Sequence, residues 1–224
     1  MKKTILIPDN INGITLGQYQ KYLSVAEGIE GEFLNQRAIE TLCGVSFGDV
    51  VNMSHKDVQE IVIKLSDILE DKNHFVERFK IEGVEFGFIT CLEEITSGEY
   101  ADLSAYMTKP EDMHKAMAVM FRPIVERYKD KYKISEYNGT KDFADIMKFM
   151  PLGAALGAMV FFWTLAKDLV NATQHYTQTE MMEELSQQQD TSLKSGGFTK
   201  TFMLSQKEIL EDLMKSLKST FTNV

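Results

Sequence analysis

The side chains that most often carry catalysis or bind metal ions are scattered along this sequence. It contains four histidines: His55, His74, His114 and His175. None of them forms an HxxxH or HExxH pattern, the spacings that place two metal ligands on one helix face. Cys43 and Cys91 form no CxxC pair, and we expect two buried thiols that stay reduced in a cytoplasm. The pattern therefore predicts no metal site and no disulfide framework.

Acid–base catalysis by two carboxylates is the enzymatic chemistry for which the sequence offers most material. Neighbouring acidic residues occur at four places: Glu93–Glu94, Glu111–Asp112, Glu183–Glu184 and Glu211–Asp212. All four suit solvated helix faces or first helical turns. The two carboxylates of a hydrolase meet only in the folded chain, so an enzyme with an unrecognised carboxylate site stays an alternative. No GxSxG, P-loop or GxGxxG motif occurs, and we expect neither an enzyme nor a cofactor.

Phosphate binding at a helix N-terminus is the chemistry suggested by a repeated segment, ITLGQY at residues 14–19 and ITSGEY at residues 95–100. A phosphate site of this kind normally needs several glycines and a basic residue, which neither copy has. In both copies the threonine is placed to cap a helix, and Gln18 or Glu99 to complete a capping box. The flanking isoleucine and tyrosine are placed as a hydrophobic staple. The repeat therefore predicts two helix starts.

Arg122 is the one charged residue inside an apolar neighbourhood, between Phe121 and Pro123. An arginine in such a place either pairs with a buried carboxylate or faces a partner protein, and we favour the internal pair. Pro123 requires a kink or a break near Phe121 in the helix predicted there.

The elements that would position these residues are mainly helical. Helical periodicity predicts helices at residues 16–26, 32–42, 55–69, 98–107, 113–132, 151–188 and 205–224. Alternating apolar residues on both sides of Glu82-Gly83 predict a two-stranded hairpin. The predicted fold class is mainly α (α+β), a single helical domain with a small antiparallel β-hairpin near residues 76–90. Residues 4–7 are a candidate third strand.

The apolar run at residues 149–166 has 18 residues without a charge. Because Pro151 starts its helical part, about 16 residues remain, which span about 24 Å against a hydrocarbon core of about 30 Å. We therefore favour a buried central helix, in which Gly153 and Gly157 let a neighbouring segment come close. A membrane-associated, holin-like protein is the alternative.

The C-terminal part divides into a polar linker at residues 186–204 and an amphipathic helix at residues 205–224, after a core domain at residues 1–185. About 16 helical residues are too few for a stable isolated helix, so we expect this helix to dock. The residues predicted to dock on a partner are Arg122, Phe202, Ile209, Leu210, Leu213, Leu217 and Phe221.

Composition sets the class of partner. The 224 residues are 44% hydrophobic and 25% charged, which suffices for a globular core. The net charge of −9 argues against a nucleic-acid binder, which would show a basic face. We expect protein partners, no nucleic acid and no membrane.

Several stretches within residues 4–180 resemble a family of small proteins encoded among the virion-assembly genes of tailed bacteriophages. They are IPDNINGITLGQYQKYL, FKIEGVEFGFI leading into EEITSGEY, MHKAMAVMFRPI followed by YKISEY, and FMPLGAALGAMVFFWTLAKDL. The resemblance implies a non-enzymatic phage morphogenesis protein, either a tail assembly chaperone or a minor tail, neck or baseplate component. It implies other phage structural proteins (tail, neck or portal) as partners, and an oligomer where an assembly requires one. It places the chain in the host cytoplasm during assembly and, for a component, in the virion.

Overall fold

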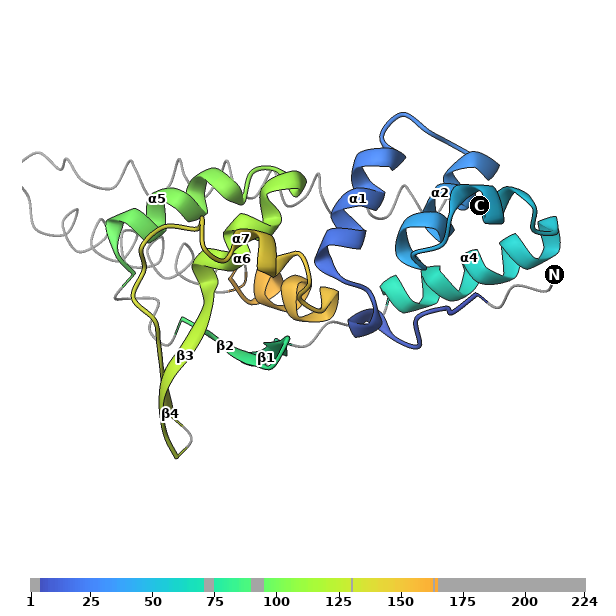
Figure 1. Ribbon diagram of the computed structural model, residues 1–224. Helices are drawn as coiled ribbons and strands as arrows, with labels where there is room; N and C mark the ends of the chain where they lie inside the picture. Colours follow the sequence, from blue (N-terminus) through green and yellow to red (C-terminus); the bar gives the residue numbers. More distant parts are fainter. Residues whose placement is uncertain (1–4, 71–74, 90–94, 130, 163, 165–224) are drawn as a thin grey trace, which may run out of the picture. The chain divides into compact units, whose positions relative to one another are not determined.

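The structure, a computed structural model, describes residues 5–70, 75–89, 95–129, 131–162 and 164 (Figure 1). The chain divides into two units, Met1–Ala158 and Met159–Val224, and almost all of the described residues belong to the first. The predicted linker at residues 186–204 and the predicted helix at residues 205–224 lie outside the described residues.

The described part of the first unit begins with helices. Its first elements are η1 (Ile11–Gly13, a 3-10 turn), α1 (Leu16–Ala26), α2 (Glu32–Leu42), α3 (Phe47–Val51) and α4 (His55–Glu70). The bounds of α1, α2 and α4 confirm the helices predicted from periodicity. Thr15 caps α1 in a complete capping box, because its hydroxyl accepts from the Gln18 amide while the Gln18 side chain accepts from the Thr15 amide. α2 packs against α1, α3 and α4.

A four-stranded antiparallel sheet follows within the described residues, in the order β1-β2-β3-β4. Its strands are β1 (Arg78–Ile81), β2 (Val84–Phe88), β3 (Phe121–Tyr128) and β4 (Lys131–Ile134). β1 and β2 form the predicted hairpin, and both turn residues, Glu82 and Gly83, have the positive φ that a type I′ turn requires. Phe79, Phe88 and Phe121 pack edge to face on this sheet.

The remaining helices lie between and after the strands. They are α5 (Ser97–Tyr106), η2 (Pro110–Asp112), α6 (Met113–Met120) and α7 (Ala144–Met147), and residues 152–162 are also helical. α6 is almost wholly buried and packs against α5 and α7. It therefore forms the centre of the core of the first unit.

Two predictions about the strands were wrong. The helix predicted at residues 113–132 ends at Met120, because Pro123 cannot continue a helix, and the chain continues as β3. Residues 5–8 form no strand, so the third strand of the sheet is β3 and not the N-terminal segment. The break near Phe121 was predicted, but the change from helix to strand was not.

The apolar segment after Pro151 is buried from residue 152 to 155 and at residues 157–159, which confirms a buried helix over these residues. A Cβ on Gly153 would lie 2.9 Å from the Ile11 side chain, so this glycine does allow a close neighbour, as predicted. Among the described residues, no helix is both long enough and apolar enough to cross a bilayer.

Candidate binding site

The predicted site residues fall into two groups. Arg122 is described, and it lies in an internal ion pair: its Nη2 is 2.6 Å from Oε1 of Glu99. Of the two roles predicted for Arg122, the structure shows the internal ion pair. In this arrangement the guanidinium is not available to a partner protein. The other predicted docking residues, Phe202, Ile209, Leu210, Leu213, Leu217 and Phe221, lie outside the described residues.

The Glu99–Arg122 pair is the centre of a polar cluster that fixes the base of β3 to α5. Glu99 is 4% exposed and Arg122 7%. Glu99 also completes the predicted capping box of α5, since its Oε2 accepts from the Thr96 amide and hydroxyl at 2.7 Å each. The carboxylate is thus shared between a helix cap and a buried cation.

Tyr137, which follows β4, closes this cluster from the other side. The Arg122 guanidinium lies over the Tyr137 ring, 5.6 Å from its centroid. The Tyr137 hydroxyl donates a hydrogen bond to Asp102 on α5. Burial, and then the hydrogen bond to Asp102, raise the pKa of the Tyr137 hydroxyl well above its ordinary value. The phenol therefore stays protonated and acts as a fixed donor, which holds the chain after β4 against α5.

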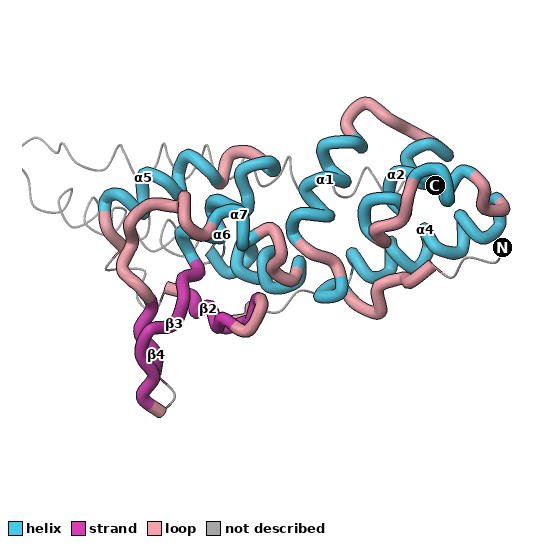
Figure 2. The backbone as a smooth tube through the Cα atoms, viewed as in Figure 1, coloured by secondary structure: helices cyan, strands magenta, loops and turns pink. Residues whose placement is uncertain are grey.

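Away from this base, β3 and β4 extend as a two-stranded arm formed by residues 124–129 and 131–134 (Figure 2). β2 pairs with β3 only from Phe121 to Pro123, whereas β4 pairs with β3 from Ile124 to Tyr128. Val125 interrupts this register as a bulge, which increases the twist of the ribbon. The arm therefore continues beyond the three strands that pack on the core.

The arm exposes apolar side chains. Val125 is 57% exposed and Tyr128 is 74% exposed. The opposite face of the arm is anchored to the sheet, because Tyr132 lies over Gly87 of β2 and its hydroxyl donates to the Phe88 carbonyl at 3.0 Å. Arg127 adds an ion pair to Glu85 of β2 at 3.1 Å. One face of the arm is thus held, and the other is open to solvent.

The two copies of the repeated segment have different surroundings, and in neither do these surroundings favour a bound phosphate. The first two amides of α1 donate to carbonyl groups, Leu16 N to Met150 O at 3.0 Å and Gly17 N to Lys148 O at 2.8 Å. At α5, Glu99 already supplies a carboxylate at the helix start. The structure therefore agrees with the interpretation of both segments as helix starts.

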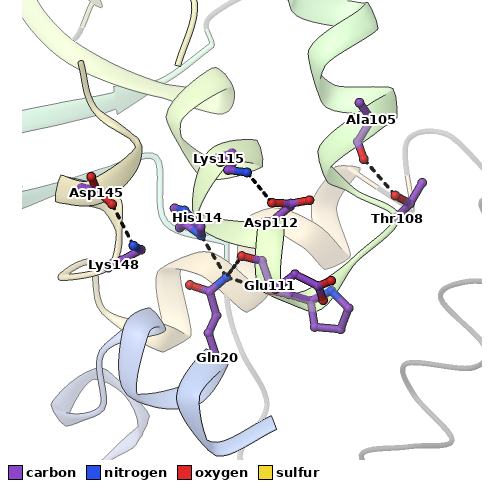
Figure 3. Close-up of polar contacts among 10 residues, drawn as sticks. Gln20, Ala105, Thr108, Glu111, Asp112, His114, Lys115, Asp145 and Lys148 are labelled. Carbon is purple, nitrogen blue, oxygen red and sulfur yellow. Dashed lines mark hydrogen bonds and ion pairs between the residues drawn. The ribbon is translucent and has the colours of Figure 1, made fainter. Parts of the chain in front are cut away.

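A second polar contact joins α1 to the start of α6 (Figure 3). The Gln20 amide nitrogen donates to the carbonyls of Pro110 and Glu111, and lies 3.1 Å from Nδ1 of His114. Desolvation, and then Lys148 and Lys115, lower the pKa of His114, with Asp145 and Asp112 opposing them.

The desolvation of His114 makes the stability of the fold depend on pH. The pKa of His114 is lower in the folded chain than its ordinary 6.5, so the contribution is complete above about pH 6.5. It is lost as the pH falls below that value, since the unfolded chain then binds the proton more readily. We expect His114→Gln to flatten the fall in unfolding free energy between about pH 7 and pH 5, measured by urea titration. His55→Gln is the control, because His55 is exposed, and an equal flattening in both variants would contradict the assignment.

Most of the remaining groups singled out from the sequence lie outside the described residues: His74, His175, Cys91, Glu93–Glu94, Glu183–Glu184 and Glu211–Asp212. Asp112 of the Glu111–Asp112 pair binds Lys115 at 2.6 Å at the start of α6, a helix-end role as predicted. Cys43 is half-buried rather than buried, and desolvation raises its pKa to about 11. Within the described residues, no three His, Cys, Asp or Glu side chains gather as metal ligands.

The arm, with its buried base, is therefore the candidate binding site of the described chain. Comparisons with protein families, with curated proteins and with solved structures find nothing that this chain matches.

Proposed function

We propose that this chain is a non-enzymatic phage morphogenesis protein that acts by binding other proteins, and that the β3–β4 arm is its binding element. The sequence resemblance supports a role in phage morphogenesis, either as a tail assembly factor or chaperone or as a minor tail, neck or baseplate component. The arm supports the mode of action. It is the single observation that carries the proposal.

The arm suits binding because it combines exposure with a fixed base. An isolated two-stranded ribbon is only marginally stable in water. Here the Glu99–Arg122 pair, the Tyr137–Asp102 hydrogen bond and the Tyr132–Gly87 contact hold it to the rest of the unit. A held ribbon loses less conformational entropy when a partner binds.

Recognition through side chains fits this arm better than strand addition. β4 is an edge strand, and edge strands can pair with another chain. Lys131 and Lys133 lie on this edge, and charged side chains, lysine above all, are the usual means of discouraging such pairing. We therefore expect Val125 and Tyr128 to supply apolar contacts, with the lysines giving selectivity.

Val125→Ser tests the role of the arm. It removes an exposed apolar contact at the bulge, and we expect at least a tenfold loss of the phage structural proteins that co-purify with the tagged chain from infected cells. Ile63→Ser on α4 is the matched control, because Ile63 is also β-branched and also 57% exposed. Equal recovery of partners with both variants would contradict the role of the arm.

The two roles within this function separate by a different measurement. Mass spectrometry of purified particles is expected to find a fixed copy number for a virion component and none for a chaperone. Co-purification with no phage structural protein would contradict the proposed function in both forms.

A further inference from the structure

The open face of the arm combines an aromatic ring with positive charge. After the bulge, Glu126 lies opposite Lys133 and Tyr128 opposite Lys131, so these four side chains share one face. Arg127 and Tyr132 form the next pair and face the other way, toward β2. Nζ of Lys129 lies 5.6 Å from the centroid of the Tyr128 ring. The open face thus presents an exposed tyrosine among three lysines.

The charge of the arm is opposite to that of the rest of the chain. Residues 124–134 contain four basic and two acidic residues, a net charge of +2. Since the whole chain carries −9, everything outside the arm carries −11. The helical part at residues 5–70 alone has ten acidic and four basic residues, a net charge of −6. The arm is therefore electrostatically complementary to another copy of the same chain.

One stretch of that helical part matches the open face of the arm in chemistry. Glu27 and Glu30 between α1 and α2, and Glu32 at the start of α2, are all exposed, and the side chain of Phe33 on α2 is also exposed. Glu32 is oriented by His55 at 3.3 Å and by Gln59 at 3.2 Å. Three acidic residues beside an exposed ring correspond to three lysines around Tyr128.

We infer that the arm of one copy binds the acidic stretch at residues 27–32 of a second copy. This inference rests on the proposed function, because it names the partner of the same arm. The two surfaces in contact differ, so the contact is heterologous, and repetition gives a closed ring or an open chain of subunits rather than a symmetric dimer.

The first test measures the mass of the purified full-length protein by sedimentation velocity over a range of concentrations. At low salt the mass is expected to rise above that of the monomer, and at about 0.5 M salt to return toward it, because screening shortens the reach of the charges. Reversing the arm charges with Lys129→Glu, Lys131→Glu and Lys133→Glu is expected to raise the concentration needed for association at least tenfold. The control reverses three exposed lysines outside the arm, Lys80, Lys109 and Lys141, and keeps association.

The second test is a charge swap between two variants. Glu27→Lys, Glu30→Lys and Glu32→Lys in one chain are also expected to abolish self-association. An equimolar mixture of this variant with the arm-reversed variant is expected to associate again, since the acidic arm of one meets the basic stretch of the other. A mixture that stays monomeric would overturn the choice of residues 27–32.

The outcomes distinguish this inference from the proposed function. A wild-type protein that stays monomeric at every concentration, while Val125→Ser still loses phage proteins, overturns the self-association and leaves the proposed function intact. A wild-type protein that stays monomeric but binds a labelled single-stranded oligonucleotide through the same lysines overturns it in favour of nucleic acid. Self-association of a protein that binds no phage structural protein would support the contact between copies and contradict the proposed function.

Discussion

Replacing Arg122 with methionine is expected to lower the free energy of unfolding by about 3–5 kcal/mol, the loss typical of leaving one member of a buried ion pair alone. Methionine fills much of the space of the arginine stem but carries no charge. The Glu99 carboxylate then keeps only its cap contacts to Thr96, in a site with little access to water. Urea unfolding measures the change, and a loss below about 1 kcal/mol would contradict the importance of the pair.

Substitution of Glu99, the other member of the ion pair, and of an exposed ion pair on the same strand tests whether burial of the pair causes this loss. Glu99→Gln leaves the guanidinium without an anion, and we expect a comparable loss, whereas the double variant with Arg122→Met is expected to lose less than the two single losses combined. Glutamine keeps an oxygen for the cap, as Gln18 does in the first copy. Arg127→Met is the control, because the Arg127–Glu85 pair is partly exposed, and we expect a loss of at most about 1 kcal/mol.

The helices of the first unit were predictable because their signals are local. Thr15 with Gln18 and Thr96 with Glu99 mark two helix starts, and the structure has both capping boxes. The hairpin of β1 and β2 was predictable for the same reason, since Glu82-Gly83 supplies the positive φ of its turn. A few neighbouring residues determine each of these features.

The arm was not predicted because the helical pattern of the segment before it is stronger than the strand pattern of the arm. The run from Met113 to Met120 is apolar and helical, and it extended the predicted helix into the strand. β3 carries the charged Arg127 on its held face and the aromatic Tyr128 on its open face, so its alternation of apolar and polar residues is weak. Pro123 is the residue from which the end of the helix was predicted, and the alternation in Lys131–Ile134 is the signal that could have revealed the second strand.

The buried ion pair shows a different limit. The apolar neighbours of Arg122 predicted a buried carboxylate, but nothing in its own segment indicated which one. Glu99 lies on another element, and the two meet only because α5 packs on α6, which leads directly into β3. The sequence difference between the copies, Gln18 in one box and Glu99 in the other, is the trace that this pairing leaves.

Gly17 and Gly98 occupy the same position in the two copies, yet their surroundings differ. A Cβ on Gly17 would lie 3.0 Å from the Lys148 carbonyl oxygen and 3.1 Å from the Lys148 Cβ. That carbonyl accepts the Gly17 amide at 2.8 Å, so it cannot move away without lengthening a hydrogen bond. Around Gly98, no atom of another described residue outside its own helix turn lies within 4 Å of the position of a Cβ. The glycine is thus required by packing in the first copy only.

Alanine at these two positions is therefore expected to act in opposite directions. Gly17→Ala is expected to lower the unfolding free energy by about 1–3 kcal/mol, because the added methyl group forces α1 away from the 148–150 segment. Gly98→Ala is expected to raise it by up to about 1 kcal/mol, since alanine favours the helix and meets nothing. Urea unfolding of both variants in the same buffer measures the difference, which cancels any effect common to a glycine in the first turn of a helix. Equal changes in the two variants would show that the repeat has one structural role in both copies, and that the close approach of Lys148 does not constrain the first.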